Sequence, residues 1–174
     1  MTCDRWVGVV AVLALALILV GVRALGAPLM LYPASASLPH GPYLRTLEAV
    51  APGTIVAFTV PDVARRYQAE RGAEVARDFL FLKPIIAGPG DRVCNSVDQG
   101  LVVNGIWLGP TASRDTEGRP LPVWTACRVL GADRYFAFSD WVPNSFDSRY
   151  FGPVDADEIA GVYRPLFVAA NLTR

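Results

Sequence analysis

The longest hydrophobic run of the chain lies near its N-terminus. Residues 6–22, WVGVVAVLALALILVGV, include no charged or strongly polar side chain, and Arg5 and Arg23 stand at the two ends of the run. A run of this length is at the lower end of what spans a bilayer as a helix, and the apolar stretch after Arg23 can extend it into the interface. The pattern predicts a transmembrane helix, so residues 1–30 are expected to form an N-terminal tip and a membrane anchor.

A cleaved signal peptide is the competing interpretation of this run. The small residues Ala34 and Ala36 offer a pattern typical of a cleavage site. The gap from Val22 to Ala36 is long for a signal peptide, however, and the apolar run is long for its hydrophobic core. A retained anchor is therefore favoured. The charges on its two sides are nearly balanced, so the positive-inside rule says little about its orientation.

After the anchor, the hydrophobic residues occur in short runs that turn residues separate. These runs predict strands at residues 54–60, 78–86, 101–108, 134–140 and 158–170, and a polar loop at residues 109–122. Asn104 and Gly105 mark the tip of a hairpin in the third run. One helix is predicted between Pro61 and Gly72, since proline favours a helix start and glycine a helix end. Residues 31–174 are thus expected to form one mainly β domain with antiparallel sheet.

The overall composition changes this picture little, but it excludes some functions. The whole chain has 174 residues, which is enough for one domain with a real core and a short extra element. Sixteen basic and sixteen acidic residues give a formal net charge of zero, so no overall field draws the chain to nucleic acid. A single histidine, His40, and three scattered cysteines lack the spacing of a metal site. Neither a metal nor a cofactor is predicted.

Lys83 is the only lysine beside fifteen arginines. A chain with this bias needs a lysine only where an amine must lose its proton or act as a nucleophile. In a strand, Phe79, Phe81 and Ile85 share a face with Lys83, and these apolar neighbours should lower the pKa of the amine. The pattern favours a general base. Chance survival of one lysine, or a lysine that reaches solvent from the strand end, is the alternative.

Ser37 is the candidate nucleophile for such a base. It lies directly after the anchor and precedes Leu38 and Pro39, and the proline stiffens the backbone that carries the hydroxyl. On its own this signal is weak, because serine before a proline is also ordinary turn chemistry.

Three segments, in order, resemble the type I signal peptidases. They are the serine turn SLPHGPY after the anchor, the lysine before the PGD turn in FLKPIIAGPGDRV, and the segment NSFDSRYFGPV at residues 144–154. The short forms of the first and third segments look most like the TraF branch, the conjugative-transfer peptidases that mature pilin precursors. The resemblance covers roughly residues 30–168.

This resemblance implies a serine protease that uses a Ser/Lys dyad and no histidine. Ser37 would attack the scissile carbonyl, and neutral Lys83 would accept its proton and later return one to the leaving amine. The backbone N–H of Ser37 and the hydroxyl of Ser35 fall where the family places its oxyanion donors.

The same resemblance assigns supporting roles in the third segment. Ser145 falls where a serine orients the lysine amine, and Asp147 and Arg149 fall where a carboxylate and a guanidinium brace the site from behind. The residues alone leave plainer interpretations open. Asp147 and Arg149, two positions apart on a strand, would form an ordinary surface ion pair, and Ser145 would be a turn residue.

The chain departs from the wider family pattern at three places. Pro84 stands where many members carry an arginine, and Ala87 where many carry a glycine. The segment before Asn144 reads SDWVP and lacks the usual GDN, so the support of the site on that side is expected to differ.

The family implies a signal-peptidase-like (LexA-like) β domain on the periplasmic side of a bacterial inner membrane. The expected activity is endoproteolytic cleavage of a membrane-presented preprotein after small residues. A pilin precursor of a conjugation or type IV secretion apparatus fits this description, and cyclisation of the product is possible in this branch. Two alternatives stay open: a LexA-like self-cleaving protease, which would need a DNA-binding domain, and a non-catalytic assembly factor on an inactive peptidase fold.

Topology of this kind makes a prediction about the cysteines. Cys94 and Cys127 lie in the domain placed outside the cytoplasm, whereas Cys3 precedes the anchor. An oxidising periplasm would join Cys94 to Cys127 and leave Cys3 reduced. A pair of buried free thiols is the alternative.

Overall fold

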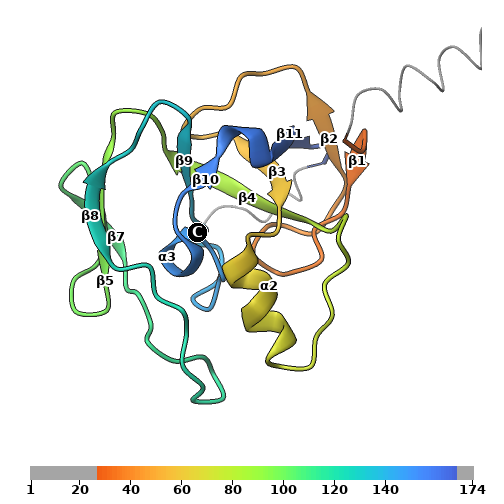
Figure 1. Ribbon diagram of the computed structural model, residues 1–174. Helices are drawn as coiled ribbons and strands as arrows, with labels where there is room; N and C mark the ends of the chain where they lie inside the picture. Colours follow the sequence, from red (N-terminus) through yellow and green to blue (C-terminus); the bar gives the residue numbers. More distant parts are fainter. Residues whose placement is uncertain (1–26, 168–174) are drawn as a thin grey trace, which may run out of the picture.

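Two antiparallel sheets form the body of the computed structural model, which describes residues 27–167. The larger sheet has the strand order β1(Met30–Leu31), β2(Tyr43–Thr46), β11(Ile159–Pro165), β3(Ile55–Thr59), β4(Leu80–Ala87), β9(Arg134–Ala137) and β10(Val154–Asp155). The smaller sheet has the order β7(Ile106–Gly109), β6(Gly100–Val103), β5(Arg92–Ser96) and β8(Ala126–Val129). The smaller sheet lies to the left in Figure 1, and the helix α2(Asp62–Ala69) lies below the larger one.

Alternating apolar residues build the core of the larger sheet. Val56 and Phe58 on β3 pack with Ile85 on β4 and Val162 on β11, and all four are buried. Along each strand, alternate side chains point to the same face of the sheet, so an alternating pattern of buried residues is expected for the predicted strands. A separate cluster under the smaller sheet includes Val93, Leu101 and Phe136. The expectation of a mainly β antiparallel domain is confirmed.

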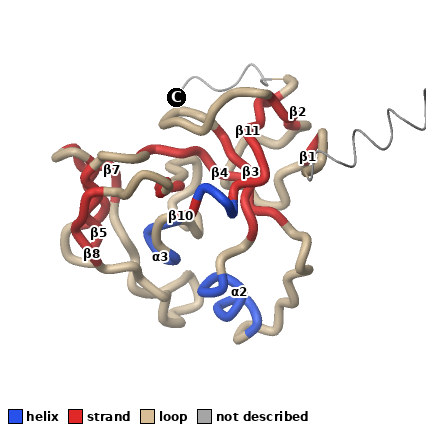
Figure 2. The backbone as a smooth tube through the Cα atoms, turned by 45° about the horizontal axis from the view of Figure 1, so that its top comes forward, coloured by secondary structure: helices blue, strands red, loops and turns tan. Residues whose placement is uncertain are grey.

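β4 belongs to the larger sheet, and the chain that follows it continues into β5 of the smaller sheet. Its residues from Leu80 to Pro84 pair with β3, whereas pairing with β9 occurs only at Ile85 and Ala87. The first half of the strand therefore has one edge that β9 does not cover. In the larger sheet β4 lies between β3 and β9, and Figure 2 shows it beside β3.

The predicted hairpin and helix both occur. β6 and β7 pair across Asn104 and Gly105, whose φ angles of 51° and 84° are the left-handed values that a tight hairpin turn needs. The helix α2 begins after Pro61, and Gly72 follows its end with a φ of 74°. The strands β5 and β8 were not predicted.

The predicted anchor at residues 6–22 lies outside the described residues. Within residues 27–167, no helix is long and apolar enough to cross a membrane. Residues just before β2 already contact the larger sheet: Met30 pairs with Leu44 of β2, and the Tyr163 hydroxyl donates to the Pro28 carbonyl at 2.6 Å.

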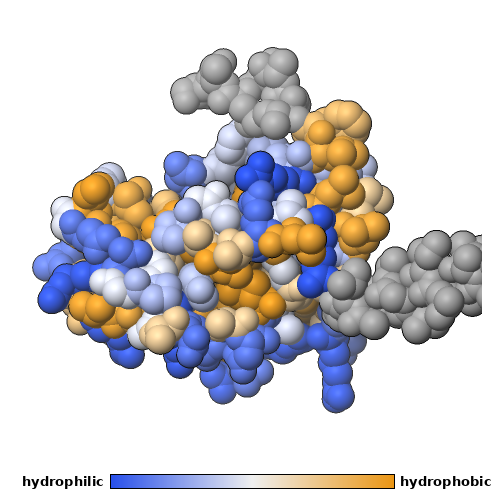
Figure 3. All heavy atoms as spheres, turned by 90° about the horizontal axis from the view of Figure 1, so that it is seen from above, coloured by the Kyte–Doolittle hydropathy of each residue, from blue (hydrophilic) through white to orange (hydrophobic). Residues whose placement is uncertain are grey.

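Large apolar side chains remain exposed around β1 and the end of β11. They are Leu29, Met30, Tyr32, Leu166 and Phe167. Both strands flank β2 at Tyr43, so these side chains lie at one end of the larger sheet. On the face seen from above, Figure 3 shows hydrophobic residues in orange gathered at the centre and along the right-hand side.

Cys94 and Cys127 stand directly opposite each other on β5 and β8, and a disulfide joins them in the structure. Cys127 is exposed and Cys94 half-buried, which does not fit a pair of buried thiols. We expect alkylation of the non-reduced protein to label Cys3 and spare the other two. Mass spectrometry of the alkylated peptides reads this directly, and labelling of all three cysteines without reductant would contradict either the pairing or the topology.

Candidate active site

Ser37 lies in an irregular segment between β1 and β2, and its side chain is only 6% exposed. The next residue, Leu38, is buried against Tyr43 and Tyr163 and so fixes the segment to the sheet. The Tyr43 hydroxyl also donates to the Pro39 carbonyl at 3.0 Å. The turn that carries Ser37 is therefore held by core packing on one side of the serine.

Lys83 lies on β4 opposite Val56 and is 5% exposed, which is rare for a lysine. Phe81 and Ile85 flank it on the same face, as predicted. Phe79, which precedes β4 and is 37% exposed, lines the same cleft as Lys83 and packs edge-to-face against Phe81, with ring centroids 6.3 Å apart. The apolar surroundings of the amine therefore come from the strand itself and from the core beneath it.

Burial lowers the pKa of Lys83 from the usual 10.5 to about 8. The charge of Asp147 acts in the opposite direction, and the charge of Arg149 adds to the lowering. The amine donates a hydrogen bond of 3.1 Å to the Ser145 Oγ, which is also buried. Lys83 is thus poised to lose its proton slightly above neutral pH.

Ser37 and Lys83 line the same cleft, which has a volume of about 800 Å³. Ser35 lies at its wall and donates from its Oγ to the Ser37 Oγ at 3.1 Å. Across residues 27–167 the structure has no direct hydrogen bond between Ser37 and Lys83. Catalytic hydrogen bonds are often loose without substrate, so the shared cleft is compatible with a nucleophile and its base.

Asp147 and Arg149 form a buried ion pair behind this cleft. Arg149 Nε lies 2.8 Å from Asp147 Oδ1, and Arg149 Nη2 lies 2.9 Å from Asp147 Oδ2. The surface-pair interpretation placed Asp147 on a strand. In the structure Asp147 instead caps the short helix α3(Ser148–Phe151). The surface-pair interpretation is wrong, because both side chains are almost fully buried.

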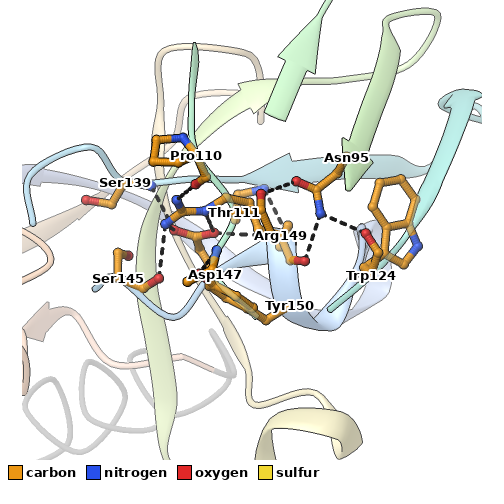
Figure 4. A network of polar contacts seen from close by, with 12 residues as sticks. Asn95, Pro110, Thr111, Trp124, Ser139, Ser145, Asp147, Arg149 and Tyr150 are labelled. Atoms are coloured by element: carbon orange, nitrogen blue, oxygen red, sulfur yellow. Dashed lines mark hydrogen bonds and ion pairs between the residues drawn. The ribbon is translucent and has the colours of Figure 1, made fainter. Parts of the chain in front are cut away.

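Arg149 uses its remaining donors to hold the surrounding chain. Its Nη1 donates to the Pro110 carbonyl at 2.7 Å, and its Nη2 donates to the Ser145 carbonyl at 3.1 Å. The guanidinium also lies over the Phe138 ring, 4.7 Å from its centroid. Figure 4 shows Arg149 at the centre of this network. The ion pair therefore fixes the backbone of the serine that contacts Lys83.

The network continues into the smaller sheet through residues that the sequence did not indicate. The Asn95 side-chain amide donates to the Trp124 carbonyl at 2.7 Å and to the Arg149 carbonyl at 3.0 Å. Thr111 Oγ1 donates to Asn95 Oδ1 at 2.5 Å (Figure 4). Asn95 and Thr111 are buried, so they tie the disulfide-bearing sheet to the site.

A stack of aromatic rings positions the segment that carries Ser145. The Phe146 ring lies between Tyr67 on α2 and Tyr150 on α3, with centroid distances of 4.7 Å and 5.2 Å. These contacts were also not predicted from sequence. They fix α2 against the third motif and place the helix beside the cleft.

Arg149→Met is expected to destabilise the fold by about 3 to 5 kcal/mol, because it leaves the Asp147 carboxylate buried and unpaired. Unfolding in urea, followed by fluorescence, measures the change. The matched control is Arg164→Met, which breaks an exposed pair with Glu48 and should cost about 1 kcal/mol or less. Equal losses for the two variants would contradict a supporting role for the buried pair.

The family model and the similar proteins found by comparison agree with each other. The model of the signal peptidase family, peptidase S26, matches residues 4–167. A plasmid transfer protein TraF from Escherichia coli is 34% identical over 139 residues, which cover 75% of this chain and 78% of that protein. A conjugal transfer protein TraF from Agrobacterium fabrum is 32% identical over 89 residues, 50% of this chain and 48% of that protein.

Among solved structures, a signal peptidase I from Enterococcus faecalis is 21% identical and has a TM-score of 0.39, with 67% of this chain and 98% of that chain covered. The family match spans nearly the whole chain, and the Escherichia coli relative matches three quarters of it. The resemblance seen in the three motifs is therefore confirmed, and the chain belongs to the signal peptidase family, peptidase S26, with similarity to the TraF plasmid transfer proteins.

Proposed function

We propose that this protein is a membrane-anchored serine endopeptidase with a Ser37/Lys83 dyad, which removes leader peptides from a preprotein. The observation that carries the proposal is the buried amine of Lys83, whose pKa lies near 8 and which shares a cleft with Ser37. A desolvated lysine beside a constrained serine is costly to maintain without a chemical use.

The proposed reaction is acyl transfer through the serine. Ser37 Oγ attacks the scissile carbonyl and passes its proton to the neutral Lys83 amine. The Ser37 backbone N–H and the Ser35 hydroxyl donate to the oxyanion. Collapse of the tetrahedral intermediate breaks the C–N bond, and protonated Lys83 returns the proton to the leaving amine. Water, or an amine of the substrate itself, then releases the acyl group from Ser37.

Ser145, Asp147 and Arg149 would hold the dyad in place. Ser145 Oγ accepts from the Lys83 amine, and Arg149 holds the Ser145 carbonyl. A general base displaced by about an ångström loses much of its effect on the rate. We therefore assign to the buried ion pair the role of keeping Ser145, and through it Lys83, in position.

The proposed substrate is a membrane-presented preprotein with small residues before the cut, namely a pilin precursor, and the relatives' names support a role in conjugation. Those relatives are described as plasmid or conjugal transfer proteins. The exposed apolar side chains around Met30 and Phe167 support a domain that lies against the bilayer. We place the anchor in the bacterial inner membrane and the β domain in the periplasm.

The test is cleavage of a synthetic peptide by the purified full chain in detergent. A peptide with alanine at the first and third positions before the cut should be cleaved once, and its counterpart with tryptophan at the first position should stay intact. Mass spectrometry identifies the products. If protein with a cooperative unfolding transition cut neither this peptide nor a co-produced pilin precursor, the non-catalytic assembly role would replace the proposal.

A further inference from the structure

A second buried serine contacts the candidate nucleophile from a distant part of the chain. Ser139 follows β9 and is 2% exposed. Its Oγ donates to the Ser37 carbonyl at 2.5 Å and accepts from the Trp141 backbone N–H at 3.3 Å. Both hydrogen-bonding functions of the hydroxyl are therefore used, and one of them is used on the backbone of Ser37.

The segment that carries Ser37 has few other backbone contacts. Among the described residues, the Ser37 and Pro39 carbonyls of this segment accept hydrogen bonds from side chains, and residues 36–37 form a local turn. The Pro39 contact is made by Tyr43, which lies close in sequence, whereas Ser139 is 102 positions away. Leu38 packs in one cluster with Leu82 on β4, and the bond from Ser139 ties the Ser37 backbone itself to the segment after β9.

Ser139 is itself held by the buried ion pair. Its backbone N–H donates to Asp147 Oδ2 at 3.4 Å, and Figure 4 shows it at the edge of the Arg149 network. Arg149 holds the Ser145 carbonyl on the other side, and Ser145 contacts Lys83. The ion pair is therefore connected by hydrogen bonds to both residues of the proposed dyad. Asp147 is connected to Ser37 through Ser139, and Arg149 is connected to Lys83 through Ser145.

We propose that Ser139 is a positioning residue that fixes the backbone of Ser37, and with it the direction of the Ser37 hydroxyl, relative to Lys83. The inference rests on the proposed peptidase function. Ser139 is the first residue of the SDWVP segment, which lacks the usual GDN. A hydrogen bond to the Ser37 carbonyl restricts rotation about the adjoining backbone bonds. This restriction fixes the direction of the Cα–Cβ bond that carries the Ser37 hydroxyl.

Removal of the hydroxyl should slow the reaction without altering the base. In Ser139→Ala we expect kcat to fall roughly 10- to 100-fold, because the nucleophile is no longer held in line. KM for the alanine-containing peptide should change little. The apparent pKa of the pH–rate profile should stay at its wild-type value, because the contacts of Lys83 with Ser145 are intact.

The matched control is Ser148→Ala. Ser148 is also a buried serine, and its Oγ accepts from the Ala137 backbone N–H at 3.0 Å, without contact to Ser37. Ser148→Ala loses one buried hydrogen bond with the backbone, and Ser139→Ala loses two backbone hydrogen bonds, to the Ser37 carbonyl and from the Trp141 N–H, so a general loss of stability would affect both. Ser148→Ala should keep kcat within a few-fold of the wild type.

Amide hydrogen exchange gives a readout that does not depend on activity. Peptides that cover residues 33–42 should exchange faster in Ser139→Ala than in the wild type, and should be unchanged in Ser148→Ala. Wild-type kcat in Ser139→Ala, or equal losses in the two variants, would overturn the positioning role. Unchanged exchange in Ser139→Ala would overturn it as well. A wild-type protein that cuts no peptide would instead refute the peptidase function, and the exchange result would still decide whether Ser139 holds the segment.

Discussion

Lys83→Arg is expected to abolish peptide cleavage although it keeps the positive charge. An arginine guanidinium stays protonated at every pH at which the protein is folded, so it cannot accept the proton of Ser37. General-base catalysis is worth roughly 10²- to 10⁴-fold in rate, and the variant should lose at least that much. The assay is cleavage of the alanine-containing peptide by the purified variant from pH 6 to pH 10.

The control for this prediction is Lys83→Ala, which removes both charge and length. The two variants should be equally inactive, and their unfolding transitions should show that both are folded. If Lys83 were only a charged side chain that reaches solvent, arginine would replace it well, as it serves at every other basic position of the chain. Cleavage by Lys83→Arg at near the wild-type rate would leave Ser37 without a base.

Ser37→Ala should cause the largest loss of all, on the order of 10⁶-fold, as expected when the nucleophile of a serine protease is removed. The alanine keeps the backbone contacts with Ser139, so the protein should remain folded and membrane-bound while uncut precursor accumulates. Immunoblotting of a co-produced precursor and the peptide assay both read this result. Processing at the wild-type rate would remove Ser37 from the site.

Ser35→Ala separates the nucleophile from its neighbour. Ser35 donates to the Ser37 Oγ and lies at the wall of the cleft, so its loss should remove one oxyanion donor. One such donor is typically worth about 100- to 1000-fold in rate. The effect should thus be clearly smaller than that of Ser37→Ala.

The fold was predictable wherever buried apolar residues alternate. β3, β4 and β11 carry Val56, Ile85 and Val162 on an inward face, and their strand pattern is evident in the sequence. β5 was missed because Asn95, a polar residue, occupies a buried position on it. β8 is mostly exposed and therefore has no apolar face to detect.

The site was predictable where a residue type was scarce or belonged to a motif. Lys83 stood out as the only lysine, and the burial that its neighbours implied is present. Ser139, Asn95 and Thr111 were missed because serine, asparagine and threonine are common in loops, and their burial depends on contacts between distant strands. Asp147 was wrongly placed on a strand in the surface-pair interpretation, because α3 has only four residues, too few to show a helical period in the sequence.

The central claim is that an unprotonated lysine amine serves Ser37, and the pH dependence of wild-type kcat/KM tests it most directly. Only the unprotonated amine can accept a proton, so the rate should be low at pH 6, rise with pH and level off above an apparent pKa of about 8. The measurement is initial rates on the alanine-containing peptide from pH 6 to pH 10, with circular dichroism at each pH to show that the fold persists. A rate that is constant over this range, or one still rising at pH 10 as for an ordinary lysine, would contradict the account.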